Sequence, residues 1–253
     1  MLERELTVPV VYSVVENDSV DCTPQHLQAW LQNRPGCWIS ERCGAPSLRK
    51  GQSSERTQAL AARRNLALDR LLQFPVDVVL VIDGGLEITP RQPLRILHQL
   101  LRNPAAAMVA AAAIQNVPDV FGEEVWSHYD SWAFRDLQGR GGITFAAIPL
   151  WDGRERERWR AGLPVAVASA FGGMAAVRRS LLEVSGARWE GSRGCEHWAF
   201  CADLRRCGPV LVDPLVQPLV RHVNPPQWSA AYAQRVRAGL GRWPGAGPHA
   251  LLR

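Results

Sequence analysis

The most distinct pattern of hydrophobic positions in the chain is the apolar run Val78–Ile82, which lies between Asp77 and Asp83. A short apolar run rich in β-branched residues predicts a strand that is buried on both faces of a sheet. A parallel strand delivers the next residue to the carboxyl edge of the sheet, where α/β proteins bind ligands. That residue is Asp83, and Gly84 and Gly85 after it allow a sharp turn or the close approach of a ligand. Asp83 is therefore a candidate oxygen ligand of a divalent cation, and the alternative is a carboxylate that only caps a turn.

Similar apolar runs predict further strands, at residues 6–15, 37–42, 108–114, 165–170, 210–213 and 216–223. Helical patterns lie between them, at residues 23–32, 54–73, 90–102, 175–184, 195–207 and 226–238. The charged run 152–160 predicts a solvated surface or a mobile loop. Strands that alternate with helices predict an α/β fold, with a mostly parallel central sheet flanked by helices in a single domain at residues 1–238. Residues 239–253 are rich in glycine and proline, which predicts a flexible C-terminal tail.

Composition and charge narrow the classes of partner. The chain has 253 residues and a formal net charge of +5, which suits an anionic ligand such as a nucleotide diphosphate. The basic residues are too scattered to predict a nucleic-acid-binding surface. No run of about 18 apolar residues occurs, so we expect no transmembrane segment and a cytoplasmic location, with peripheral contact at a membrane left open. The six cysteines form no CxxC pair, which argues against a zinc site.

Two common nucleotide-binding signatures are missing from the sequence. No GxGxxG follows the first predicted strand, and no GxxxxGK[ST] occurs. The dinucleotide-binding and P-loop classes therefore lose their best support. The ten tryptophans are either core residues or platforms on which sugar rings stack.

The order of several motifs across about residues 6–224 resembles the GT-A (Rossmann-like) fold of glycosyltransferases. These motifs are a first strand with a polar loop, AARRN at 61–65, the strand before Asp83, FGGMAAVRR at 171–179, CEH at 195–197 and the late His222. Three segments resemble more narrowly the fungal capsule-associated α-1,3-mannosyltransferase family. They are ENDSVDCT at 16–23, YDSWAFRD at 129–136 and CEHWAFCADLR at 195–205.

This resemblance implies a binding site for a nucleotide-diphosphate sugar. In the fold that the chain resembles, the end of the first strand faces the nucleotide base and ribose, and the AARRN segment lies beside the nucleotide. The implied binding residues are Tyr12, Ser13, Glu16, Arg64, Asn65, Asp83, Gly84, Gly172 and Gly173. Tyr12 as an ordinary strand residue and Asn65 as an ordinary helix residue are the alternatives.

The resemblance also implies a metal on the donor diphosphate. Asp83 matches the first position of the Asp-x-Asp motif, but Gly85 stands where the second carboxylate is usual. Asp83 with His222 could hold Mn²⁺ or Mg²⁺, because these ions are often bound by few protein ligands plus phosphate oxygens and water. The alternative is a metal-free enzyme in which Arg63, Arg64 or Arg221 neutralises the diphosphate.

On the acceptor side, the resemblance implies catalytic roles for Glu196 and His197. The mannosyltransferases that the chain resembles retain the anomeric configuration, and Glu196 would then position the acceptor or stabilise positive charge on the sugar. His197 stands where inverting relatives carry the aspartate that acts as general base. Sugar recognition is expected from the aromatic and charged group Tyr129, Asp130, Trp132, Arg135 and Asp136. The alternative is a structural cluster in which Asp130 or Asp136 pairs with Arg135.

The sequence as a whole predicts a glycosyltransferase (hexosyltransferase) that moves a sugar from a nucleotide-diphosphate sugar to a hydroxyl group. Mannose from GDP-mannose is the first candidate, and the acceptor is a glycan, a lipid-linked sugar or a peptide. One alternative is a metal-independent transferase that uses a UDP-sugar. The other is a degenerate GT-A domain that binds a sugar nucleotide or a partner without turnover. This alternative stays open because Gly85 stands where the second carboxylate of the metal motif is usual.

Overall fold

The computed structural model describes residues 6, 8–44, 53–118, 124–143 and 146–220. The helices within these residues are α2 (Thr23–Leu31), α3 (Ser54–Leu71), α4 (Arg91–Arg102), α5 (Gly153–Arg160), α6 (Arg179–Ser185) and α7 (Glu196–Arg205). The first strands are β1 (Tyr12–Asn17), β2 (Gly36–Glu41), β3 (Val78–Ile82), β4 (Leu86–Glu87), β5 (Met108–Ala110) and β6 (Ile114–Pro118). The remaining strands are β7 (Glu124–His128), β8 (Val165–Val167), β9 (Met174–Arg178), β10 (Val210–Val212) and β11 (Leu219–Val220). No helix in these residues is both long and apolar enough to cross a bilayer.

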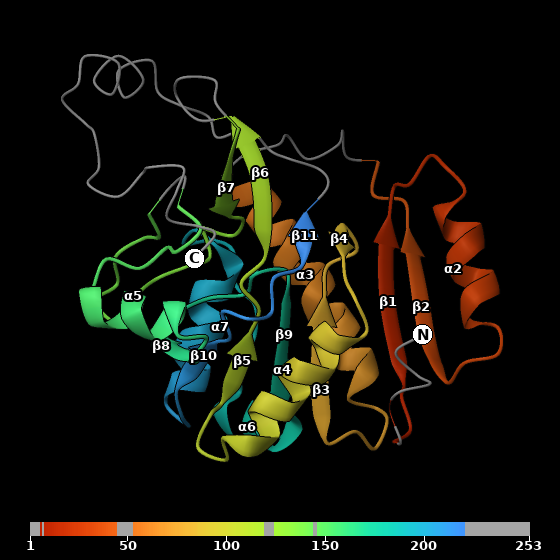
Figure 1. Ribbon diagram of the computed structural model, residues 1–253. Coiled ribbons are helices and arrows are strands. Elements are labelled where there is room, and N and C mark those ends of the chain that lie inside the picture. The colour runs from red at the N-terminus through yellow and green to blue at the C-terminus, as the bar shows by residue number, and fades with distance from the viewer. Residues whose placement is uncertain (1–5, 7, 45–52, 119–123, 144–145, 221–253) are drawn as a thin grey trace.

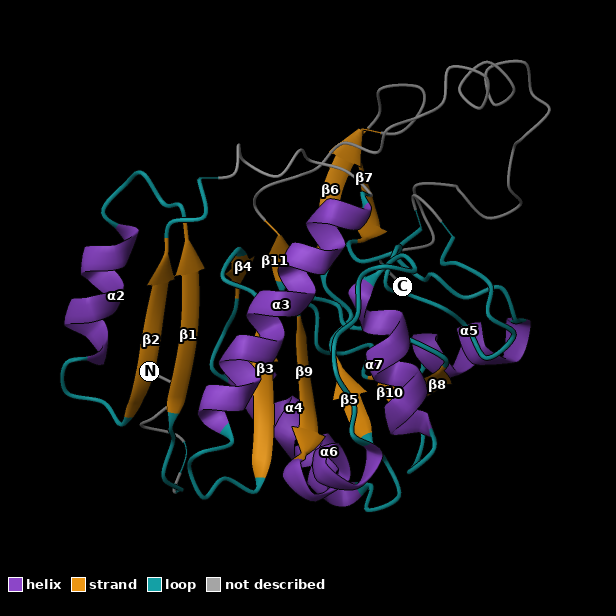
Figure 2. Cartoon of the chain, turned by 180° about the vertical axis from the view of Figure 1, so that it is seen from behind, coloured by secondary structure: helices purple, strands orange, loops and turns teal. Residues whose placement is uncertain are grey.

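The predicted α/β class is confirmed, and helices cover both faces of the largest sheet. This sheet has the strand order β3-β9-β5-β10-β8. Side chains alternate along its strands: Val79 and Val177 face the core formed with α3, α6 and α7, whereas Val78 and Ala176 face α4. Figures 1 and 2 show α4 on one face and α3 with α7 on the other. Packing on both faces explains why most of the run Val78–Ile82 is apolar, although Ile82 at its end is exposed.

The strand directions are more mixed than the predicted mostly parallel sheet. Strand β10 pairs in parallel with β5, but β9 runs antiparallel to both of its neighbours, β3 and β5. An apolar pattern does not determine the direction of a strand. Residues 168–173 lead into β9 without a helix, and a crossover helix is what usually makes neighbouring strands parallel.

Several predicted elements differ from the observed ones. The segment predicted as a helix at 175–184 begins as the strand β9, because its small apolar residues fill a fully buried position between two strands. The charged run predicted as surface or loop forms α5, whose first turn is capped by Asp152 Oδ1 accepting from the backbone N–H groups of Arg154 and Glu155. Strands β6 and β7 form an antiparallel pair in a stretch that carried no strand prediction beyond Ile114. The predicted helix at 226–238 and tail at 239–253 lie outside the described residues.

The first two strands form their own parallel sheet beside β3 (Figure 1). Ser13 in β1 donates a hydrogen bond from its hydroxyl to the Ala67 carbonyl oxygen of α3, at 2.7 Å. A side chain at Gly36 would overlap the Tyr12 carbonyl, so glycine lets β2 approach β1. Helix α3 therefore contacts β1 on one side and lies over the central sheet on the other.

The turn Phe171-Gly172-Gly173 connects the centre of the fold to the end of β3. Gly172 and Gly173 have φ angles of +58° and +73°, in the left-handed region that favours glycine. The Gly173 carbonyl accepts from the Asp83 N–H at 2.9 Å, and the Gly172 N–H donates to Asp130 Oδ2 at 3.1 Å. This turn thus determines where Asp83 and Asp130 lie relative to each other.

We expect Gly172→Ala to destabilise the fold strongly. Its Cβ would overlap the Ala111 carbonyl in a backbone conformation that L residues rarely adopt, so a loss of about 3 kcal/mol or more in the free energy of unfolding is expected. Gly85→Ala is the matched control, because no atom lies within 4 Å of the added Cβ and its φ angle is ordinary. Urea unfolding of both variants measures the difference, and equal stability of the two would contradict this account.

His128 makes the fold sensitive to acid. It is buried between Phe134 and Trp159, both ring nitrogens lack a hydrogen-bond partner in the described structure, and burial lowers its pKa from 6.5 to about 4. The unfolded state then binds the proton more tightly than the folded state. The contribution of His128 to the free energy of unfolding is therefore fully present above about pH 6.5 and decreases as the pH falls toward 4. We expect a loss of about 3 kcal/mol from this group. His128→Phe should remove that part of the pH dependence of unfolding, and an unchanged dependence would show that His128 does not titrate in this way.

Candidate active site

The centre of the candidate site is an ion pair at the carboxyl end of β3. Arg64 Nη1 lies 2.9 Å from Asp83 Oδ1, and Arg64 Nη2 donates to Asp83 Oδ2 at 3.2 Å. The Asp83 side chain is 38% exposed, and the Arg64 side chain is 12% exposed. A planar guanidinium that meets a carboxylate through two nitrogens fixes its orientation as well as its charge. The position of Asp83 at the sheet edge agrees with the sequence prediction, and its pairing with α3 goes beyond the role of a turn cap.

Arg64 is held on three sides by residues that are distant in the sequence. Its guanidinium carbon lies 4.6 Å from the centre of the Phe171 ring, and its Nε lies 3.4 Å from Glu196 Oε1. Burial acts to lower the pKa of Arg64, but the carboxylates of Asp83 and Glu196 outweigh it and raise that pKa. The positive charge of Arg64 is therefore firmly maintained, and its position is constrained on each side.

Glu196 and His197 begin α7, and the structure buries both. Each is only 3% exposed, because the helix turns Cys201 and Leu204 into the core and brings its first turn inward. Glu196 Oε1 faces Arg64 Nε and His197 Nε2, each at 3.4 Å. Glu196 is therefore turned toward Arg64 and His197, and its expected role on the acceptor side stays a prediction. Its carboxylate contacts the guanidinium that pairs with Asp83.

Asp130 adds a third carboxylate next to this group. Both of its oxygens accept from backbone N–H groups, those of Gly172 and Ala133. Burial, followed by the negative charges of Glu196 and Asp83, raises the pKa of Asp130 to about 6. Burial and the charges of Asp130 and Asp83 raise the pKa of Tyr129 to about 12. The guanidinium of Arg64 is thus surrounded by three carboxylates, and Arg56 also lies within electrostatic range of Tyr129.

The predicted acceptor-binding group divides into two parts. Tyr129 and Asp130 lie within electrostatic range of Asp83. Asp136 is fully buried, pairs with Arg140 Nε at 2.6 Å and accepts from the Gln138 and Arg140 N–H groups. The structure thus gives Asp136 a role in a turn and removes it from an acceptor surface.

Arg135 and Trp132 belong to a neighbouring aromatic contact. The Arg135 guanidinium lies 4.0 Å from the centre of the Trp198 ring, and Trp198 Nε1 donates to the Trp132 carbonyl oxygen at 3.1 Å. Arg135 donates to the Phe134 carbonyl at 2.8 Å, and neither predicted aspartate pairs with it in the described residues. The alternative of a structural Asp130–Arg135 or Asp136–Arg135 pair is therefore wrong.

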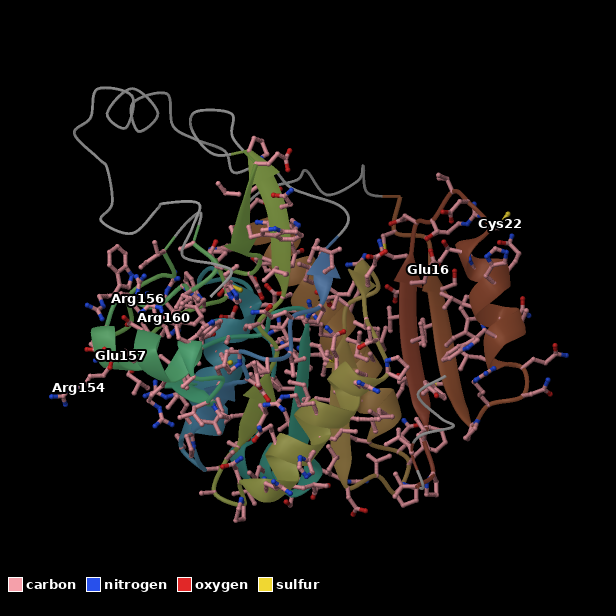
Figure 3. The ribbon with its side chains drawn as sticks, in the orientation of Figure 1. Glu16, Cys22, Arg154, Arg156, Glu157 and Arg160 are labelled. Atoms are coloured by element: carbon pink, nitrogen blue, oxygen red, sulfur yellow. The ribbon has the colours of Figure 1, made fainter. Side chains whose placement is uncertain are left out.

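The residues predicted to contact the nucleotide base and ribose are engaged in structural contacts. Tyr12 packs edge-on against Trp30, with ring centres 4.7 Å apart. Glu16 accepts from Ser40 Oγ and the Ser19 N–H, and the hydrogen bond from Ser40 is the main reason that its pKa is lowered. Figure 3 shows Glu16 on the β1–β2 side of the molecule and the arginines of α5 on the opposite side. A nucleotide at the end of β1 stays a prediction.

Asn65 contacts the backbone of the loop before α7. Its Oδ1 accepts from the Trp189 N–H at 3.1 Å, and its Nδ2 donates to the Trp189 carbonyl at 2.9 Å. These two bonds use the polar groups that were expected to meet a nucleotide. The sequence analysis assigned no site role to Trp189 or Phe171. Phe171 could have been found from its position directly before Gly172-Gly173, whereas Trp189 had no such indication.

A divalent cation would find one accessible carboxylate here. No group of three His, Cys, Asp or Glu side chains suited to a metal occurs in the described residues, and His222 and Arg221 lie outside them. Asp83 offers oxygen donors, and the charges of the nearby Glu196 and Asp130 favour a cation. Arg64 already occupies both Asp83 oxygens. The residues therefore fit a weakly held ion, and a bound diphosphate would have to supply its remaining ligands.

Comparison with known proteins identifies the family. A mannosyltransferase from Pyrobaculum calidifontis, solved with GDP-Man and Mn²⁺, has a TM-score of 0.45 and 17% identity over 91% of this chain, which spans only 51% of that protein. Protein A197 from STIV has a TM-score of 0.42 and 12% identity, over 88% of this chain and 98% of its own. No curated protein sequence matches. The family model described as Cryptococcal mannosyltransferase 1 matches residues 7–203, and the chain therefore belongs to this family of glycosyltransferases.

Proposed function

We propose that the protein transfers a sugar, with mannose as the first candidate, from a nucleotide-diphosphate sugar to a hydroxyl group of an acceptor. Membership in a mannosyltransferase family supports the class of reaction. The observation that carries the proposal is the half-exposed Asp83 at the carboxyl end of β3, paired with a guanidinium and surrounded by further carboxylates. A GDP-linked donor is the first candidate, and a UDP-linked donor is the second.

The donor diphosphate binds beside Asp83 and Arg64 in this proposal. The departing diphosphate gains negative charge as the sugar leaves, so a positive group placed there in advance lowers the barrier. Arg64 supplies a permanent charge at that place, and Asp83 would hold a divalent cation, whose charge would help to stabilise the leaving group. Glu196 holds Arg64 from behind and places a negative charge near a sugar that becomes cationic in the transition state.

Acceptor binding is assigned to Tyr129 and Asp130. Asp130 is half-buried and lies close enough to Asp83 and Glu196 for their charges to raise its pKa. A carboxylate whose pKa is about 6 can accept a hydrogen bond from an acceptor hydroxyl and can exchange a proton near neutral pH. A glycan, a lipid-linked sugar and a peptide all carry such a hydroxyl.

A domain that binds a sugar nucleotide without turnover is the second candidate. Gly85 offers no second carboxylate, and Arg64 occupies both oxygens of Asp83. A domain that only binds the nucleotide needs positive charge for the diphosphate, which Arg64 and a weakly held cation would supply, but no catalytic group. Binding and turnover must therefore be measured separately.

We expect GDP-mannose to raise the midpoint of thermal unfolding, and to raise it further with Mn²⁺. A ligand at about a hundred times its Kd stabilises the folded state by about 2.7 kcal/mol. Asp83→Asn should lose the Mn²⁺-dependent part of the rise. Asp69→Asn should keep it, since Asp69 is also paired with an arginine but lies exposed elsewhere on α3. The proposal is wrong if no GDP- or UDP-sugar shifts the midpoint, and a tight Mn²⁺ complex without nucleotide would contradict the weak metal site.

Glu196→Gln should separate binding from turnover. The amide keeps the size of the side chain but removes the negative charge, so donor affinity should stay within a few-fold while transfer falls at least about tenfold. Radiolabelled transfer and calorimetric donor binding measure the two quantities, and NMR of the product determines its anomeric configuration. An active Glu196→Gln enzyme would show that this charge does not act in the transition state.

A further inference from the structure

Both ring nitrogens of His197 face specific partners inside the protein. The indole Nε1 of Trp189 lies 3.2 Å from His197 Nδ1 and donates a hydrogen bond to it. An indole N–H is only a donor, so Nδ1 carries no proton. A neutral imidazole must then carry its proton on Nε2, and Nε2 lies 3.4 Å from Glu196 Oε1. The ring is stacked on Phe171, with centres 4.2 Å apart and planes 16° apart, so its rotation is restricted.

Trp189 is itself held in place by α3 and α7. Its ring stacks on Phe200, with centres 4.2 Å apart and an interplanar angle of 4°. Its backbone N–H and carbonyl both bond to the Asn65 side chain. Thr57 in α3 donates to the Gly191 carbonyl at 2.6 Å, which fixes the same loop two residues later.

These contacts form a closed circuit that begins and ends on one helix. Asn65 holds Trp189, Trp189 bonds to His197, His197 faces Glu196, and Glu196 contacts Arg64. Because Arg64 and Asn65 are neighbours in α3, the position of the guanidinium is coupled to the loop and to the start of α7.

We infer that His197 is a positioning residue, locked by Trp189 as the neutral Nε2–H tautomer, which presents its N–H to Glu196 and so maintains the contact between Glu196 and Arg64. The assignment of the circuit to the donor site rests on the proposed function. The tautomer lock itself does not.

This geometry is incompatible with His197 as the general base considered in the sequence analysis. The Nδ1 lone pair is used by Trp189, the Nε2 position carries a proton, and the residue is 3% exposed. Burial, followed by the positive charge of Arg64, holds the pKa of His197 well below its usual range. His197 therefore remains neutral and has no free lone pair for the proton of an acceptor.

Nitrogen-15 NMR of the labelled protein tests the tautomer lock without any donor. His197 is assigned by the loss of its signals in His197→Gln. We expect a single neutral tautomer with the proton on Nε2, unchanged between about pH 5 and 8. Trp189→Phe keeps the stack on Phe200 but removes the indole donor, and His197 should then show a mixture of tautomers. A proton on Nδ1 in the wild type, titration in that range, or an unchanged tautomer in folded Trp189→Phe would overturn the inference.

Transfer kinetics test the positioning role with a matched pair of variants. His197→Gln can place an amide N–H where Nε2 stood, whereas His197→Phe keeps the ring stack and donates nothing. We expect His197→Gln to keep kcat within about fivefold and His197→Phe to lower it at least about tenfold, both with nearly unchanged KM for the donor. Equal inactivation of both, with folding intact, would contradict the positioning role. If no nucleotide sugar binds while NMR confirms the tautomer, the proposed function fails and the lock stands.

Discussion

The arrangement of the site depends on one buried positive charge, the guanidinium of Arg64. It connects the half-exposed Asp83 at the end of β3 to the buried Glu196 at the start of α7. An unpaired charge in such a place is costly, and the loss of one partner of a buried pair typically destabilises a protein by about 3–5 kcal/mol. Any change that moves α3, β3 or α7 therefore also moves the charges at the candidate site.

The backbone adds a second constraint next to this charge. The Gly172-Gly173 turn reaches Asp83 and Asp130 through backbone hydrogen bonds, and its preceding residue Phe171 supplies the ring that Arg64 and His197 both contact. The same short segment therefore leads into β9, orients two carboxylates and packs against the guanidinium of Arg64. The need for glycine here is explained by the packing of Gly172 on Ala111, without any nucleotide contact.

Prediction from sequence succeeded where a local pattern had a local cause. The apolar run Val78–Ile82 and the turn after it placed Asp83 correctly at the edge of the sheet. It failed where a residue's role depended on distant partners. Asp136 was expected to meet an acceptor, but it is buried against Arg140. The helix predicted at 175–184 was right only for its second half, which lies in α6, because residues 175–178 fit between two other strands as part of β9.

By itself, the sequence determined the α/β class, the position of Asp83 and, through motif order, the resemblance to a mannosyltransferase family that the family match confirms. Periodicity, turn residues and motifs act over a few neighbouring residues, so they can be read along the chain. The tertiary structure alone decided which groups pair with Arg64, that Glu196 faces inward, and that Trp189 reaches His197. Several of the contacts around Arg64 and Trp189 join segments more than a hundred residues apart, such as Arg64 with Glu196 and Asn65 with Trp189. Their free energy depends on burial and distance, which a linear pattern does not contain.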